Sequence, residues 1–141
     1  MVRLFAITLA LCAALASAWA AGAADPDTFR LSPALLDRME AVAAELRSAP
    51  KARNGEHDDE DEAESVEDIA RKLDADPRIR AALARHGLTS REYATATLAL
   101  LHAGMALAVE KAPGARAGLQ KLTPAQRANL ELVRARQQAR K

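Results

Sequence analysis

Apolar residues recur at the helical period of 3.6 in several segments of the chain, and residues that begin or end helices separate these segments. The first segment, residues 32–47, places its apolar side chains on one narrow face of a helical wheel, namely Leu35, Leu36, Met39, Val42, Ala43 and Leu46. Shorter stripes follow in residues 65–86, which Asp76 and Pro77 divide into two helices, and again after Thr123, the expected N-cap of the last helix with Gln126 at its N3 position. The pattern predicts an amphipathic helix at each place.

The longest apolar segment is Tyr93 to Val109, seventeen residues without a formally charged side chain. It follows a corner in which Gly87 ends one helix and Thr89 N-caps the next, with Glu92 placed to complete a capping box. We predict that this helix, residues 90–111, is the centre of the fold.

The two sides of the predicted central helix differ in side-chain size. The large apolar residues fill a broad arc, namely Tyr93, Leu98, Leu100, Leu101, Met105, Leu107 and Val109. The other face is small and partly polar, and contains Thr95, Ala96, Ala99, His102, Ala103 and Ala106. This small face either admits the close approach of another helix or is a surface for a partner, in which case Thr95, Ala99, His102 and Ala106 are the candidate contacts.

The composition favours helices over strands. Aromatic residues make up 3% of the chain, so the core has to be built from aliphatic side chains and alanine, which favour helices. We therefore predict an all-α fold, an irregular bundle of four to five helices that forms a single domain over residues 24–141. Residues 48–64 contain no large apolar side chain and are predicted to be a mobile acidic loop. The basic C-terminal end, RARQQARK, is expected to fray.

The first 23 residues have the pattern of a secretory signal peptide. Arg3 precedes an apolar stretch, and small residues allow cleavage after Ala20 or Ala23. We therefore predict a periplasmic or secreted protein without a transmembrane span in the mature chain. Cys12 is the only cysteine and would be removed with the signal peptide, which leaves no thiol for catalysis, metal binding or a disulfide.

Two groups of residues are candidates for binding a metal or a cofactor. The acidic run offers carboxylate and imidazole ligands for a divalent cation, namely His57, Asp58, Asp59 and Asp61, although it lacks the spacing of an EF-hand. His102 could ligate haem iron together with Met39 or Met105, although no Cys-x-x-Cys-His is present for covalent attachment. The simpler interpretations are a solvated charge run and a structural histidine, and we predict no cofactor.

Catalytic and nucleic-acid-binding patterns are missing from the sequence. There is no Gly-x-Ser-x-Gly, no His-Glu-x-x-His and no phosphate-binding glycine loop, so the sequence favours a protein that is not an enzyme. Residues 76–101 superficially suggest a helix-turn-helix, but the second helix is too apolar to lie in a DNA groove. We therefore predict no nucleic-acid partner.

Two stretches resemble known groups of proteins. Residues 76–109, DPRIRAALARHGLTSREYATATLALLHAGMALAV, resemble small exported bacterial proteins of unassigned function, which implies an exported helical domain. Residues 122–126, Leu-Thr-Pro-Ala-Gln, are similar to the Leu-Thr-x-x-Gln motif of Spy/CpxP-type periplasmic chaperones, which are helical and bind unfolded or partner proteins. A second copy of the motif would be residues 88–92, with Glu in place of Gln. This resemblance implies Leu122, Thr123 and Gln126 as partner-binding candidates.

The hypothesis that combines these features is an exported, non-enzymatic helical protein that binds a protein partner in the cell envelope, in the manner of a chaperone. Two alternatives stay open. One is a haem or metal carrier that uses His102 with a methionine, or the acidic run around His57. The other is a peripheral envelope component whose basic C-terminus binds anionic lipid headgroups.

Overall fold

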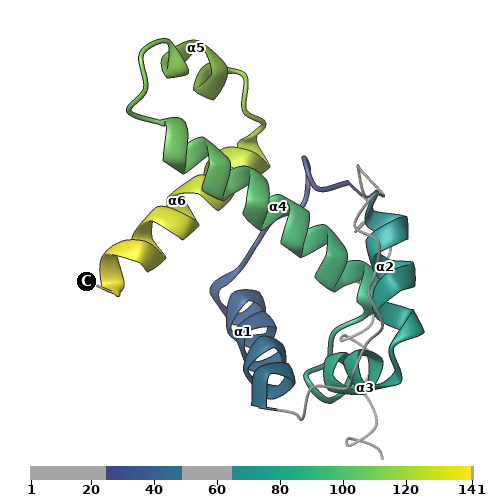
Figure 1. Cartoon of the computed structure of the whole chain (residues 1–141). Helices are drawn as coiled ribbons and strands as arrows, with labels where there is room; N and C mark the ends of the chain where they lie inside the picture. The colour runs from purple at the N-terminus through teal and green to yellow at the C-terminus, as the bar shows by residue number, and fades with distance from the viewer. Residues whose placement is uncertain (1–24, 49–64, 141) are drawn as a thin grey trace, which may run out of the picture.

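The computed structural model describes residues 25–48 and 65–140. This part of the chain contains six α-helices and no strand: α1 (Pro33–Ser48), α2 (Val66–Ala75), α3 (Pro77–Arg85), α4 (Ser90–Val109), α5 (Ala115–Gln120) and α6 (Pro124–Ala139) (Figure 1). The prediction of an all-α fold is confirmed. The extra helix is α5, which forms in the expected connector after Gly114 takes a φ of 83°. The predicted signal peptide and, apart from Ser48, the predicted acidic loop lie outside the described residues.

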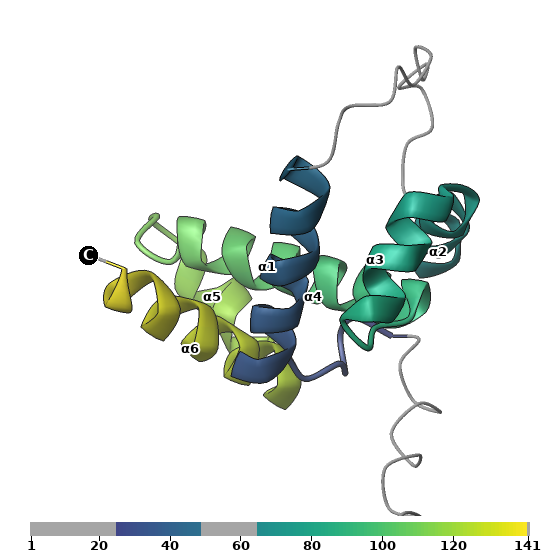
Figure 2. The same ribbon diagram turned by 90° about the horizontal axis from the view of Figure 1, so that it is seen from below.

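The helix α4 lies in the middle of the fold. The helices α2 and α6 make its most extensive contacts, α2 beside its N-terminal end and α6 crossing it further along (Figures 1 and 2). The helix α1 contacts α3, and α3 in turn contacts α4. The central position predicted for residues 90–111 is therefore confirmed, with the helix ending at Val109.

The corner between α3 and α4 has the hydrogen bonds of a Schellman motif. Gly87 has a φ of 66°, which a side chain would disfavour, and its N–H donates to the carbonyl of Ala84 at 3.1 Å. The Leu88 N–H donates to the carbonyl of Leu83 at 2.9 Å, and both leucine side chains are buried. The predicted corner is therefore confirmed, and it fixes the direction in which α4 leaves α3.

The predicted capping boxes differ in completeness. Thr89 Oγ1 accepts from the Glu92 N–H at 3.0 Å, but the carboxylate of Glu92 lies 3.8 Å from Arg38 of α1. At the start of α6 both halves of the box are present, between Thr123 and Gln126. The α6 start is therefore the more complete cap, although both threonines act as predicted.

The core forms where α1 meets α3 and α4. Its buried members come from the segment before α1, from α1, from the α3–α4 corner and from α4: Leu31, Leu35, Leu36, Met39, Val42, Ala82, Leu83, Leu88, Ala96 and Ala99. The apolar stripe predicted for α1 supplies four of these residues, and its burial is the main reason that this helix folds against the others. At the far end of α1, Glu45 Oε2 lies 3.0 Å from Nε2 of His86, which links α1 to the end of α3.

The small face of α4 is the buried face. Four of its residues, Thr95, Ala96, Ala99 and Ala103, are buried, whereas Leu101, Met105 and Val109 are 52%, 51% and 51% exposed. Ser90 and Ala94, on another side of α4, are also buried. Small side chains let neighbouring helices approach the axis of α4 closely, because the distance between packed helices depends on the side chains between them. Of the two roles considered for this face, close helix packing therefore applies to its buried residues.

A bulky residue on the small face should destabilise the fold. Ala99 is 2% exposed, so we expect Ala99→Trp to lower the free energy of unfolding by about 3 kcal/mol or more, because the helices would have to move apart. Ala108→Trp on the same helix is the matched control, because Ala108 is exposed. Urea denaturation followed by circular dichroism measures both. Equal stability of the two variants would contradict the packing described here.

Candidate partner-binding surface

The exposed side of α4 carries a stripe of large apolar side chains. Leu101, Met105 and Val109 follow one another at intervals of four residues, so they lie on one face of the helix. They are the large hydrophobic residues that are exposed among the described residues. We call these three residues the α4 stripe. Neighbouring apolar residues that are exposed together are typical of interaction sites.

The α4 stripe continues a face that α2 covers nearer the N-terminus. Ala94 lies seven residues before Leu101, hence on the same face, and it is fully buried. One turn earlier, Ser90 Oγ donates to Asp74 Oδ1 of α2 at 2.5 Å, which places α2 over this part of α4. Glu67 in the first turn of α2 also contacts the start of α4, at Arg91, so α2 covers the N-terminal part of this face. The α4 stripe is the exposed part that follows it.

Three cations follow the α4 stripe along the chain. Lys111, Arg116 and Lys121 are exposed, and none of them pairs with a carboxylate of the described residues. At the other end of α4, by contrast, Arg91 donates to Glu67 of α2 at 2.6 Å. Uncompensated positive charge therefore lies at the C-terminal end of α4, next to Val109, although Arg47 and Arg127 elsewhere in the described residues also lack a carboxylate partner.

The arginines at the C-terminal end of α6 and just beyond it pair with carboxylates of α1. Arg136 donates to Asp37 of α1 at 2.6 Å and lies 3.1 Å from Glu40, and Arg140 also pairs with Glu40. The hydrogen bond from Arg136 lowers the pKa of the Glu40 carboxyl below its usual value, and Asp37 raises the pKa of Arg136. The helix α6 runs through Ala139, and these pairs connect its end to α1, while the expected fraying of the basic end stays a prediction.

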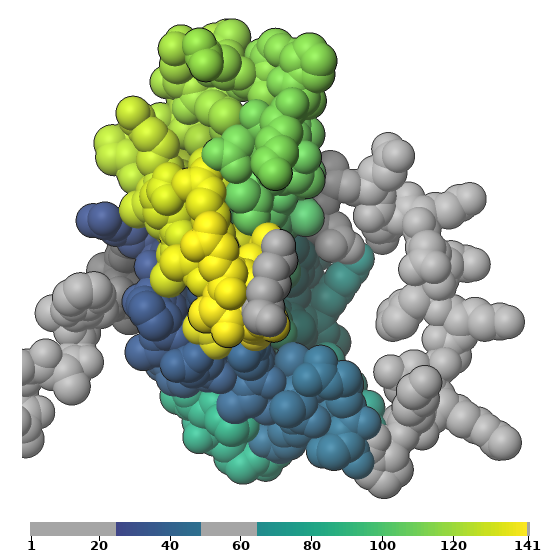
Figure 3. All heavy atoms as spheres, turned by 90° about the vertical axis from the view of Figure 1, so that its left-hand side faces the viewer, coloured from purple at the N-terminus to yellow at the C-terminus, as the bar shows by residue number. Residues whose placement is uncertain are grey.

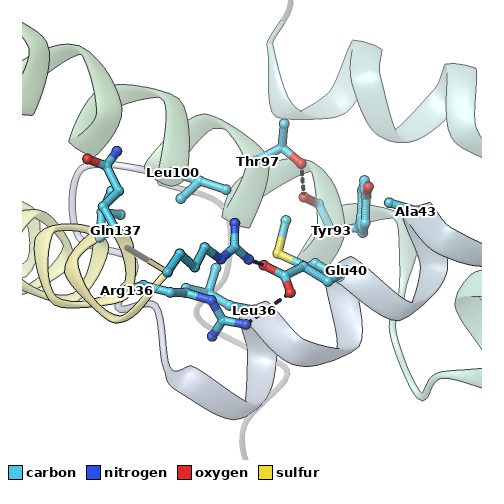
Figure 4. A pocket seen from close by; sticks show the side chains of 11 residues that line it. Leu36, Glu40, Ala43, Tyr93, Thr97, Leu100, Arg136 and Gln137 are labelled. Atoms are coloured by element: carbon cyan, nitrogen blue, oxygen red, sulfur yellow. Dashed lines mark hydrogen bonds and ion pairs between the residues drawn. The ribbon is translucent and has the colours of Figure 1, made fainter.

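A groove lies between α1, α4 and α6, on the face shown in Figure 3. Its volume is about 360 Å³, and Leu36, Met39, Tyr93 and Leu100 supply much of its apolar wall (Figure 4). Glu40 and Arg136 lie across its mouth and pair with each other. A space of this size with an apolar lining can accept a large side chain of a partner.

The predicted haem ligands are not brought together around one cavity. Met39 is buried and lines the groove, but neither His102 nor Met105 lines it. Met105 belongs to the α4 stripe, and His102 Nδ1 lies 3.4 Å from the carboxylate of Asp27. The contact with Asp27 therefore supports the interpretation of His102 as a structural residue.

Residues 25–31 form an N-terminal segment, with a turn at residues 26–28, that α6 holds through its side chains. Thr123 Oγ1 donates to the carbonyl of Asp27 at 2.6 Å, and Gln126 Nε2 donates to its carboxylate at 2.8 Å. The residues of the Leu-Thr-x-x-Gln stretch thus contact the protein's own N-terminal segment as well as capping α6. Leu122 is half-buried beside them.

Asn129 completes this attachment, and the sequence analysis missed it. Its Nδ2 donates to the carbonyl of Phe29 at 2.8 Å, and its Oδ1 accepts from the N–H of Leu31 at 2.9 Å. The side chain is 1% exposed, so these bonds satisfy groups that water cannot reach. Asn129 follows Thr123 and Gln126 at three-residue intervals, and an amide beside the apolar Leu130 was the available signal.

The predicted partner contacts on the small face are largely inaccessible. Thr95 and Ala99 are 0% and 2% exposed, and Ala106 is half-buried, so the accessible side of α4 is the one with large apolar residues. The candidate metal ligands His57, Asp58, Asp59 and Asp61 lie outside the described residues. Within residues 25–48 and 65–140, no group of three or more His, Cys, Asp or Glu side chains is placed to hold a metal ion.

The length and composition of α4 would also suit a membrane span, and 28% of the relevant window is buried in the fold. A core helix of a water-soluble protein meets the same criterion, so the absence of a transmembrane span stays a prediction. No family model matches the chain, and no similar curated protein or solved structure was found. The resemblances seen in the sequence therefore stay predictions as well.

Removing the amide of Asn129 should loosen the N-terminal segment. In Asn129→Ala the N–H of Leu31 and the carbonyl of Phe29 lose their partners, so we expect the free energy of unfolding to fall by about 2–3 kcal/mol. Gln138→Ala on the same helix is the control, because Gln138 is exposed, and it should change stability by less than about 0.5 kcal/mol. Chemical denaturation of both variants measures the difference, and an Asn129→Ala variant as stable as the control would count against the attachment.

Proposed function

We propose that this chain is an exported, non-enzymatic helical protein that binds a protein partner in the cell envelope through the α4 stripe. The observation that carries this proposal is the exposure of Leu101, Met105 and Val109 on the central helix. The signal-like N-terminus and the similarity to exported chaperones support the location and the type of partner.

The size of the α4 stripe favours weak and reversible binding. Fully burying a Leu, Met or Val side chain contributes about 1.5–3 kcal/mol, so three half-exposed side chains can contribute about 3 kcal/mol together. Association itself costs at least about 4 kcal/mol, so the stripe needs further contacts and does not by itself support a permanent complex. Transient capture of apolar segments is the behaviour that fits.

The side chains of the α4 stripe suit varied partners. Methionine is flexible and polarizable, and it adapts to differently shaped apolar surfaces. No charged residue lies between Tyr93 and Val109, so a partner would not have to desolvate a fixed charge there. The neighbouring groove offers an additional apolar space about 360 Å³ in volume. These features favour recognition of exposed apolar segments over recognition of one specific sequence.

The titratable groups of the groove give no support to a catalytic role. Glu40 pairs with both Arg136 and Arg140. These pairs lower the pKa of the Glu40 carboxyl, which favours its ionised form. A general acid or base needs a pKa near the working pH. Binding is therefore the function that this geometry supports best.

Two acidic residues on the α4 stripe should abolish binding and leave the fold intact. We expect the double substitution Leu101→Glu with Met105→Glu to remove the ability of the purified protein to suppress aggregation of a chemically unfolded model protein, because charges would replace the apolar contacts. Light scattering measures the effect. Thermal unfolding of the variant should match the parent closely, because both positions are about half exposed.

The matched control places the same two charges on another exposed surface. Ala135→Glu with Gln138→Glu on α6 should suppress aggregation as well as the parent does, because both residues are exposed and neither lines the groove. Suppression by the α4 double variant at the parent's level would overturn the proposal. So would a parent protein that does not suppress aggregation at all.

A further inference from the structure

The helix α2 shows within the molecule what kind of segment packs on this face of α4. It is short and amphipathic, with Val66 buried and Ile69 and Leu73 partly buried. Its first turn is acidic, with Glu67 and Asp68, and Glu67 accepts from Arg91 of α4 at 2.6 Å. Its last turn lies at the start of α4, where Asp74 contacts Ser90. The covered part of the face therefore holds an amphipathic helix with acidic residues in its first turn.

Exposed cations follow the uncovered part of the same face along the chain. Lys111, Arg116 and Lys121 follow Val109 closely in the chain, and α5 lies beside the C-terminal end of α4 (Figure 1). A helix that lies antiparallel on the α4 stripe would bring its N-terminus to these cations. Acidic residues in its first turn would then be favoured twice, by the dipole of their own helix and by the lysine and arginine side chains.

We propose that the α4 stripe binds a short amphipathic helical segment that runs antiparallel to α4 and has acidic residues in its first turn. This inference rests on the proposed function and names the chemistry of its partner. The segment would cover the part of this face that α2 leaves exposed. Its apolar side chains would cover Leu101, Met105 and Val109, and its first turn would lie against Lys111 and Arg116.

A second copy of this chain fits the surface less well. Stable dimers bury about 800 Å² on each partner, far more than three half-exposed side chains provide. The first turn of α4 contains one acidic residue, Glu92, which faces Arg38 of α1. In a second copy that turn is also covered by α2, so it could not reach Lys111.

The test uses the full chain and three labelled probe peptides of about 16 residues with the same apolar stripe. The first has Asp and Glu in its first turn, the second has the same residues in its last turn, and the third has Lys in their place. Fluorescence anisotropy at low salt should show the first peptide binding about fivefold more tightly than the second, and the third should bind most weakly. Higher salt should reduce these differences, because the charges are exposed.

Variants assign the effect to particular residues. Lys111→Glu with Arg116→Glu should remove the preference for the first peptide, and Met105→Glu should abolish binding of all three. Arg47→Glu is the control, because Arg47 is an exposed cation of α1 at a distance from the α4 stripe, and it should bind all peptides as the parent does.

Each other outcome would overturn the inference, and most would leave the proposed function standing. Equal binding of the first two peptides would reject the orientation and the role of the cations. Suppressed aggregation of a model protein without binding of any peptide would reject the helical segment as the partner. Sedimentation with anionic lipid vesicles that depends on Lys111 and Arg116, without peptide binding, would replace the segment with a membrane surface. A dimer that Met105→Glu dissociates would replace it with a second copy.

Discussion

The close packing of neighbouring helices against the small face of α4 is the contact on which the rest of the fold depends. Alanine and threonine side chains occupy little space, so the neighbouring helices pack near the axis of α4, and the buried Ala96 and Ala99 join the core that α1 and α3 complete. Because this face is used for packing, Leu101, Met105 and Val109 on another side of the same helix have no position in the core. Their exposure is a consequence of which face the neighbours occupy.

This division separates stability from binding. Residues such as Ala99 determine how well the helices pack, whereas Leu101 and Met105 lie outside that contact and can be exchanged without opening the core. The polar attachments act at the edges. Asn129 holds the N-terminal segment, and the pairs of Arg136 with α1 hold the end of α6. A binding surface on a rigid central helix needs such support, because the helix must not shift when a partner leaves.

Local sequence signals predicted the helix ends well. Gly87 could be recognised because a left-handed residue was needed there, and Thr123 with Gln126 because a capping box involves residues only three positions apart. The wheel also separated the small residues Ala99 and Ala103, which are buried, from Leu101, Met105 and Val109, which are exposed, but it grouped the partly buried Tyr93 and Leu100 with the exposed residues. It could not determine which face is buried, since that depends on segments far away in the chain. Arg136 and Asn129 show the same limit, because their partners lie about 100 residues earlier and no local pattern connects them.

The accessibility of single thiols along α4 tests the central claim most directly. In a chain whose only cysteine is removed by Cys12→Ser, one cysteine at a time replaces Leu101, Met105, Ala96 or Ala99, and the rate of maleimide labelling is measured under native conditions. The account predicts rapid labelling at the two stripe positions, near the rate for the unfolded chain, and strong protection at the two alanine positions. Protection at Leu101 and Met105 with rapid labelling at Ala96 and Ala99 would contradict it, because α4 would then bury its large face.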